Sequence, residues 1–129
     1  MNNYSDYGTA LLRISLGIIF IAHSLYLKLV VFTLPGTAGF FESIGLPAVL
    51  AYITFAAEAI GGIALLVGLY TRWAALVLIP IALGATWAHS EAGWVFSNAG
   101  GGWEYPLFLT ITCAVIALQG NGRLALGRE

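Results

Sequence analysis

The sequence has 129 residues, of which 60% are hydrophobic and only 9% are charged, and its formal net charge is −1. Soluble domains carry about 25% charged residues, so this composition and a mean hydropathy of +0.90 indicate an integral membrane protein, whose partner is the lipid bilayer. The single cysteine excludes an internal disulfide and a C-x-x-C redox pair, and the lack of any basic run argues against nucleic-acid binding. We expect one membrane domain over residues 1–129.

The first apolar stretch predicts a membrane span over residues 9–32, long enough to cross a bilayer as a helix. Lys28 lies close enough to the outer end for its ammonium to reach the interface, whereas His23 lies nearer the middle. One side of this helix carries residues with helical spacing, namely Arg13, Gly17, Phe20, Ser24 and Lys28, with His23 on the flank. The span therefore holds ionisable groups at different depths.

The second expected span, residues 48–70, carries Glu58 near its midpoint. A carboxylate at that depth costs roughly 2.5–3.5 kcal/mol on insertion scales, so Glu58 should face protein, water or a partner rather than lipid. Gly61 and Gly62 fall on the same side, where small residues let a neighbouring helix approach closely. Glu58 and His23 are expected at similar depth, and two interpretations stay open: a structural pair that satisfies both groups, or a functional site.

The remaining segments complete an all-α membrane protein, predicted as a four-transmembrane-helix bundle. Residues 33–46 contain helix breakers and then a small apolar face, which indicates either a short interfacial helix in the first periplasmic loop or a plain connector. The third span is expected over residues 73–89, with Pro80 in its middle, and the fourth over residues 104–119.

The distribution of arginines predicts the orientation of the chain. With four spans, the arginines fall on one side of the membrane at the level of the headgroups: Arg13, Arg72, Arg123 and Arg128. The loops on the other side carry acidic residues and no Lys or Arg beyond Lys28 at a helix end. The positive-inside rule then places the N and C termini in the cytoplasm.

Five ionisable residues are candidates for lining a polar pocket that opens toward the periplasmic side: His23, Lys28, Glu58, His89 and Glu104. His89 and Glu104 lie at the outer ends of their spans, where contact with interfacial water is a sufficient structural explanation. Aromatic residues available as pocket walls are Phe20, Phe55, Trp87 and Tyr105. No metal site is expected, because the E-x-x-H spacing of di-iron bundles is absent, and the different depths of the two histidines disfavour haem.

Seven motifs follow one another along the chain. They are GIIFIAHSLYLK, GTAGFFESIGLP, AAEAIGG, ALLVGLYTRWAA, H-x-x-x-G, GGWEYPLFL and GNGRLAL. Their content and order, from Arg13 to Leu126, resemble the DoxX family of small bacterial membrane proteins. The recurrent polar positions of that family match His23, Lys28, Glu58, Arg72, His89, Glu104 and Arg123. The resemblance implies a bundle of four membrane helices in the bacterial cytoplasmic (inner) membrane.

The resemblance also implies an association with redox systems, since members or relatives occur with thiosulfate:quinone oxidoreductase, with a terminal quinol oxidase and in an oxidative-stress complex with superoxide dismutase. We therefore expect an accessory or quinone-interacting subunit of a quinone-linked oxidoreductase, with a quinone in the polar pocket. Other redox subunits or a second copy of the chain are the expected partners. The alternative is a non-catalytic membrane scaffold, or a transporter of a small molecule or of protons.

Overall fold

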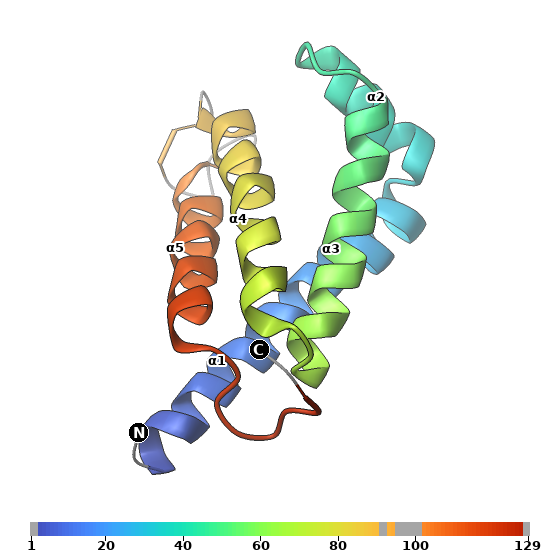
Figure 1. Ribbon diagram of the computed structural model, residues 1–129. Coiled ribbons are helices and arrows are strands. Elements are labelled where there is room, and N and C mark those ends of the chain that lie inside the picture. The colour runs from blue at the N-terminus through green and yellow to red at the C-terminus, as the bar shows by residue number, and fades with distance from the viewer. Residues whose placement is uncertain (1–2, 91–92, 95–101, 128–129) are drawn as a thin grey trace.

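The computed structural model describes residues 3–90, 93–94 and 102–127, and every regular element within these ranges is a helix (Figure 1). The helices in chain order are α1 (Asn3–Ile21), the π-helix η1 (Ala22–Val31), α2 (Leu34–Ser43), α3 (Val49–Val67), α4 (Thr71–Ala88) and α5 (Glu104–Gln119). The predicted all-α class is confirmed for the part of the chain that the structure describes.

Three helices are long and apolar enough to cross a membrane: Tyr4–Val31, Val49–Val67 and Thr71–Ala88. The first span is continuous from α1 into η1 and begins several residues before the predicted start. The fourth predicted span has the expected bounds in α5, but its 16 residues correspond to about 24 Å, less than the ~30 Å of a bilayer's hydrocarbon core. Three of the four predicted spans are therefore long and apolar enough to cross a membrane, and α5 is shorter than this length.

The segment between the first two spans contains a helix, α2, rather than a plain connector. The Thr33 hydroxyl accepts a hydrogen bond from the Gly36 N–H at 3.2 Å, and Pro35 occupies the first turn, where its missing N–H removes no helix bond. Thr37 and Ala38 are buried, and α2 packs against α3 and η1. This contact fixes α2 beside the half of the first two spans that lies away from the chain termini.

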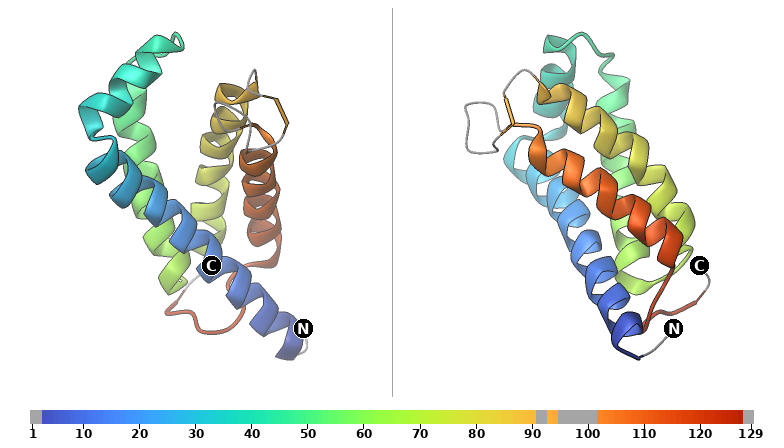
Figure 2. Two further views of the ribbon diagram at one scale, coloured as in Figure 1. Left: turned by 180° about the vertical axis from the view of Figure 1, so that it is seen from behind. Right: turned by 90° about the vertical axis from the view of Figure 1, so that its left-hand side faces the viewer.

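The helices form two packed pairs that meet near the chain termini. α1 packs along α3 and α4 packs along α5, and the pairs are joined by contacts of α3 with α4 and of α1 with α5. Figure 1 and the left view of Figure 2 show the pairs close together at the end where both termini lie and spread apart toward the other end. α2 and η1 belong to the α3 side of this V-shaped arrangement.

Glycines allow the close crossing of α1 and α3. A Cβ atom on Gly17 would lie 2.8 Å from the Gly62 carbonyl oxygen, and one on Gly62 would lie 3.0 Å from the backbone nitrogen of Ile21. Side chains from all four long helices fill the core around this crossing, among them Leu16, Phe20, Leu65, Leu78 and Cys113. The predicted inward face of the second span is confirmed, because Glu58, Gly61 and Gly62 are buried while Ile60 is 71% exposed.

Arg13 is completely buried inside the protein. Its guanidinium makes five hydrogen bonds to backbone carbonyls: Nε to Asn121 at 2.8 Å, Nη1 to Leu65 at 2.7 Å and Leu66 at 3.2 Å, and Nη2 to Arg123 at 2.7 Å and Leu124 at 2.9 Å. A guanidinium has five N–H groups in a fixed fork, so these bonds match its donor capacity. Arg13 therefore connects the first helix, the end of α3 and the segment after α5.

The end of α3 shows why a buried arginine fits there. A helix leaves its last four carbonyls without intrahelical partners. The Ala64 carbonyl accepts from Gly68 N at 2.9 Å, those of Leu65 and Leu66 accept from Arg13, and that of Val67 accepts from Leu126 N at 2.9 Å. All four are satisfied, two of them by Arg13, so the helix can end inside the protein.

The segment 120–127 crosses this end of the bundle and is held along its length. The Asn121 side chain accepts from the Thr71 hydroxyl and donates to the Gly127 carbonyl at 2.7 Å. Gly122 has φ +67°, and a Cβ atom there would lie 2.7 Å from the Asp6 carbonyl oxygen. We call residues 120–127 the strap. At Gly122 the backbone of the strap lies so close to the backbone of α1 that only glycine fits.

Candidate functional site

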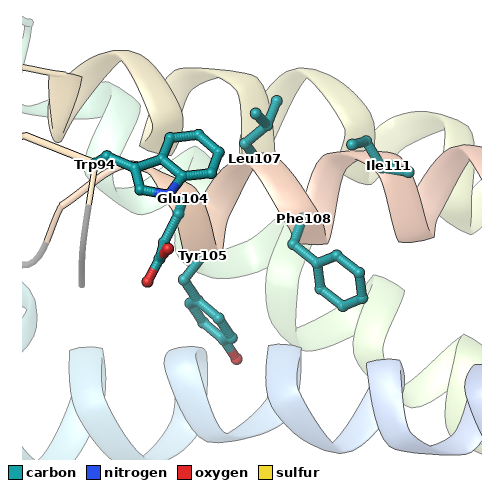
Figure 3. Close-up of a pocket in the computed structure, with 6 residues that line it drawn as sticks. All are labelled: Trp94, Glu104, Tyr105, Leu107, Phe108 and Ile111. Atoms are coloured by element: carbon teal, nitrogen blue, oxygen red, sulfur yellow. The ribbon is translucent and has the colours of Figure 1, made fainter. Parts of the chain in front are cut away.

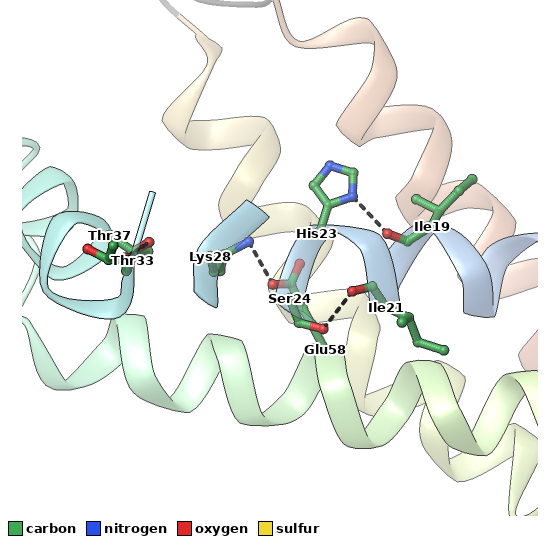
Figure 4. A network of polar contacts seen from close by, with 8 residues as sticks. All are labelled: Ile19, Ile21, His23, Ser24, Lys28, Thr33, Thr37 and Glu58. Atoms are coloured by element: carbon green, nitrogen blue, oxygen red, sulfur yellow. Dashed lines mark hydrogen bonds and ion pairs between the residues drawn. The ribbon is translucent and has the colours of Figure 1, made fainter. Parts of the chain in front are cut away.

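Glu58 forms an ion pair with Lys28 at the middle of the second span. Lys28 Nζ lies 2.7 Å from Glu58 Oε1, and the two side chains are 16% and 7% exposed (Figure 4). The distance is that of an ion pair. The angles are not those of a hydrogen bond, because Glu58 Oε1 has no hydrogen-bond donor among the described residues. The structural pair expected between Glu58 and His23 is therefore wrong in its partner, because Lys28 turns inward instead of reaching the interface.

The π-helix η1 carries both His23 and Lys28. Hydrogen bonding from i to i+5 widens the turn, so residues five apart come nearer to one face than in an α-helix, where they differ by about 140°. η1 contains His23 and Lys28, which are five residues apart, and the buried Ser24, whose hydroxyl donates to the Ile21 carbonyl at 3.2 Å. The stripe expected on the first span continues through η1, because Phe20, Ser24 and Lys28 are 2%, 0% and 16% exposed, whereas His23, on its flank, contacts Tyr105 on α5.

His23 points away from the ion pair and toward α5 (Figure 4). Its Nδ1 lies 2.9 Å from the carbonyl oxygen of Ile19. Its ring is stacked with the ring of Tyr105, with centroids 6.4 Å apart and an interplanar angle of 23°. Because a carbonyl oxygen only accepts, Nδ1 carries the hydrogen of this bond, and in the neutral imidazole Nε2 then carries a lone pair.

Tyr105 also lines an open hollow of about 370 Å³ at the beginning of α5 (Figure 3). The lining residues are Trp94, Glu104, Tyr105, Leu107, Phe108 and Ile111. In Figure 3 the Glu104 carboxylate and the Tyr105 ring extend to the same side of α5. The surface of this hollow is mostly apolar, with a carboxylate, a phenol and an indole as its polar side-chain groups.

The chain before α5 is fixed by a short backbone pairing. Trp103 N donates to the Gly93 carbonyl at 2.9 Å, and Glu104 N donates to the Trp94 carbonyl at 3.0 Å. The rings of Trp94 and Trp103 meet edge to face with centroids 4.4 Å apart. These contacts place the Trp94 indole over the first turn of α5, which the sequence did not single out as a site.

A second hollow, of about 350 Å³, lies where the ends of α2 and α4 approach each other. It is lined by Ser43, Ile44, Trp87, Ala88 and Ser90. Trp87, one of the predicted pocket walls, therefore lies away from the hollow that Tyr105 lines. Neither hollow includes His23, Lys28 or Glu58.

The other predicted site residues lie on different helices. Phe20 is 2% exposed and belongs to the hydrophobic core, and Phe55 is half-buried on α3. His89 caps the end of α4, where its backbone N–H donates to the Ala85 carbonyl at 3.1 Å. Within the described ranges no three His, Cys, Asp or Glu residues lie close enough to hold a metal ion. The predicted site residues thus fall into the Lys28–Glu58 pair and a group around Tyr105 that includes His23 and Glu104. The remaining four belong to neither: Phe20, Phe55, Trp87 and His89.

The fold and these buried charges define an all-helical membrane protein with polar groups inside its spans. The chain belongs to the DoxX family, which it matches over residues 8–91. It is also 36% identical over 126 residues to a Bacillus subtilis (strain 168) protein named "Putative oxidoreductase CatD", an alignment that covers 98% of this chain and 89% of that protein. No solved structure matches the chain.

Proposed function

We propose that this protein is an accessory subunit of a membrane redox system and binds a quinone-type ring in the hollow at the beginning of α5. The observation that carries the proposal is the grouping of Trp94, Tyr105 and Phe108 around one open, apolar hollow that also contains the Glu104 carboxylate. Sites for planar ligands combine apolar and aromatic walls with a few polar groups that fix orientation. This hollow has both.

His23 adds a further polar group next to Tyr105. Its ring stacks on Tyr105, which lines the hollow, so the imidazole contacts one of the hollow's walls. The contact joins η1 and α5, which come from the two different helix pairs. A ring bound against Tyr105 would therefore lie next to a contact between the two arms of the V-shaped arrangement.

The relatives support a redox role. The family resemblance implies an association with quinone-linked systems, and the Bacillus subtilis relative is named as an oxidoreductase. Cys113, the single cysteine, is buried in the core. We therefore propose that electrons reach the bound ring from another subunit and that this chain supplies the binding site.

We propose further that the protein lies in the bacterial cytoplasmic membrane with four spans, α5 being the fourth. α5 packs along the whole of α4, and the two termini lie at one end of the molecule (Figure 1). An even number of spans is compatible with termini on one side. The positive-inside rule then assigns that side to the cytoplasm and the hollow of α5 to the opposite half of the membrane.

Equilibrium dialysis of a short-tailed benzoquinone against the protein in nanodiscs tests the proposal. Tyr105→Ala removes an aromatic wall and its hydroxyl, and we expect the dissociation constant to rise at least about tenfold, since aromatic contacts and a polar contact are lost together. Leu118→Ala is the matched control on the same helix, because Leu118 is 81% exposed and outside the hollow. Equal dissociation constants for Tyr105→Ala and wild type would contradict the proposed site.

The alternative function, a membrane scaffold or a transporter of protons or a small molecule, is favoured by one observation. Lys28 and Glu58 are buried against each other and take no part in either hollow. A paired charge inside a span fits a structural contact or a step in proton transfer. Proton uptake into liposomes that contain the protein, lost in Glu58→Gln, would support transport over redox binding.

A further inference from the structure

We propose that the hollow between the ends of α2 and α4 binds an organic ammonium group, such as the headgroup of an aminophospholipid. Its volume of about 350 Å³ lies at the lower end of the range of small-molecule sites, roughly 300–1,000 Å³. Polar and apolar atoms share its surface almost equally, unlike the mostly apolar hollow at the beginning of α5. The inference concerns a different site from the proposed redox function and does not depend on it.

The two serine hydroxyls that line this hollow already use their hydrogens. Ser43 Oγ donates to the Phe40 carbonyl at 2.6 Å, and Ser90 Oγ donates to the Trp87 carbonyl at 2.7 Å. A hydroxyl has one hydrogen and two lone pairs, so each oxygen can still accept a hydrogen bond but has no second hydrogen to donate. These side chains therefore suit a ligand that donates hydrogen bonds, as a primary ammonium group does.

Two helices end at the hollow, and both bring the negative end of their dipole to it. α2 ends at Ser43 and α4 ends at Ala88, and both residues belong to the lining. The aligned peptides of a helix place about half an elementary negative charge at its C-terminal end and favour a cation near the last turn. The lining residues carry no charge, and Glu42, which precedes Ser43, is acidic. The helix ends thus favour a cation over an anion.

Trp87 supplies an aromatic surface at the same place. It lines the hollow and is 55% exposed, so a ligand can reach its ring. The face of an indole attracts an ammonium group more strongly than any other aromatic side chain does. Trp87 lies in the last turn of α4, a helix long and apolar enough to cross a membrane, and such ends lie at the level of the lipid headgroups. Lipid ammonium groups are therefore the nearest source of ligand.

The hollow lies between the two arms of the V-shaped arrangement, at the end away from the chain termini (Figure 1). Among the described residues α2 packs against α3 and η1 and makes no comparable contact with α4. Ser43 comes from one arm and Ser90 follows the last helix turn of the other. An ammonium group has three N–H donors, so a single bound group can bond to both arms.

Competition between two lipids with the same acyl chains tests the proposal. The full-length protein in dodecylmaltoside is mixed with equal amounts of palmitoyl-oleoyl phosphatidylethanolamine and phosphatidylglycerol, and native mass spectrometry measures the bound lipid. The sample is kept at about pH 8, above the range in which histidine ordinarily gains charge, because His89 precedes Ser90. We expect about tenfold more bound phosphatidylethanolamine, from the aromatic contact and the two helix ends together. Equal binding, or more bound phosphatidylglycerol, would overturn the proposal.

Trp87→Ala tests whether the preference arises in this hollow. We expect the preference to fall several-fold, because the aromatic surface is lost. Trp73→Ala is the matched control, since Trp73 lies near the other end of α4 and is 67% exposed. It should keep the wild-type preference. An unchanged preference in Trp87→Ala would overturn the assignment to this site.

Replacing Ser90 changes the charge at the hollow in both directions. Ser90→Asp adds a carboxylate and should raise the preference for phosphatidylethanolamine several-fold, whereas Ser90→Lys brings its own ammonium group and should abolish it. The same replacements of Leu126, which is 75% exposed and lies in the strap at the opposite end of the molecule, are the controls for net charge. Equal effects at the two positions would overturn the proposal.

An excess of ethanolamine in the same competition distinguishes the two sources of an ammonium group. Loss of the bound phosphatidylethanolamine would support a site that takes the ammonium group of a soluble amine as well. Retention of the lipid would support a site for the lipid headgroup, held in place by its acyl chains. Absence of binding by both the lipid and the amine would overturn the proposal.

Discussion

Arg13 Nε donates a hydrogen bond of 2.8 Å to the backbone carbonyl of Asn121, joining two residues that are 108 positions apart in the chain. Together with its bonds to the end of α3, this contact makes a single side chain the junction of three segments. A planar fork with five donors has no equivalent among the other side chains, and lysine offers only three. The position therefore demands arginine and not simply a positive charge.

Replacing Arg13 by lysine should destabilise the protein strongly. Arg13→Lys keeps the charge but leaves at least two buried carbonyls without donors, at about 1–3 kcal/mol for each unsatisfied group. We expect a loss of about 3 kcal/mol in reversible unfolding in mixed micelles. Arg123→Lys is the control, because that side chain is 46% exposed and its contact with Asp6 at 3.4 Å should contribute at most about 1 kcal/mol. Similar losses for both variants would contradict the special role of Arg13.

Lys28 and Glu58 should be energetically coupled. Removing either charge leaves the other buried and unpaired, so we expect Lys28→Met and Glu58→Gln each to cost about 3 kcal/mol, and the double variant to cost clearly less than their sum. Thermal unfolding in detergent measures all three. Glu42→Gln, at an exposed position on α2, is the matched control and should leave the melting temperature unchanged. Additive losses would show that the two side chains act independently.

The glycine crossing of α1 and α3 should not tolerate even a methyl group. Gly17→Ala would place a carbon 2.8 Å from the Gly62 carbonyl, so the helices must separate, and we expect a loss of about 1–3 kcal/mol. Gly84→Ala serves as control, since a Cβ atom there has no neighbour within 4 Å. Because alanine favours helices over glycine, Gly84→Ala should be neutral or stabilising by up to about 1 kcal/mol. A melting temperature for Gly17→Ala equal to that of Gly84→Ala would refute the close crossing.

The orientation in the membrane can be measured with reporter fusions. Alkaline phosphatase fused after Glu129 should be inactive, because the proposed four spans and the positive-inside rule would place the C terminus in the cytoplasm. The same enzyme inserted after Gly45, between α2 and α3, should be active, since this loop lies at the opposite end of the molecule from both termini (Figure 1). An active C-terminal fusion together with an active Gly45 insertion would mean that α5 does not cross the membrane, and an active C-terminal fusion with an inactive Gly45 insertion would mean that the orientation is reversed.

The sequence predicted the helices well because apolar length and helical spacing are local properties. The inward face of α3 and the bounds of α5 follow from those patterns alone. The site was predicted less well for two physical reasons. Lys28 extends inward to Glu58 while His23 bonds to the Ile19 carbonyl, and helical spacing does not reveal the direction in which a flexible side chain extends. Arg13 bonds only to backbone carbonyls, and no side-chain pattern in the sequence reveals a carbonyl acceptor.

The order in which ribosomes make the chain gives the buried arginine a further consequence. When Arg13 has entered the membrane, Leu65 and Leu66 are not yet synthesised, and the strap carbonyls follow only after more than a hundred further residues. During that interval the guanidinium lacks its native partners, at a cost of roughly 2.5–3.5 kcal/mol if it lies at mid-depth. Completion of the fold must therefore wait for the last part of the chain, so nascent chains that stop before the strap should be targets for membrane proteases.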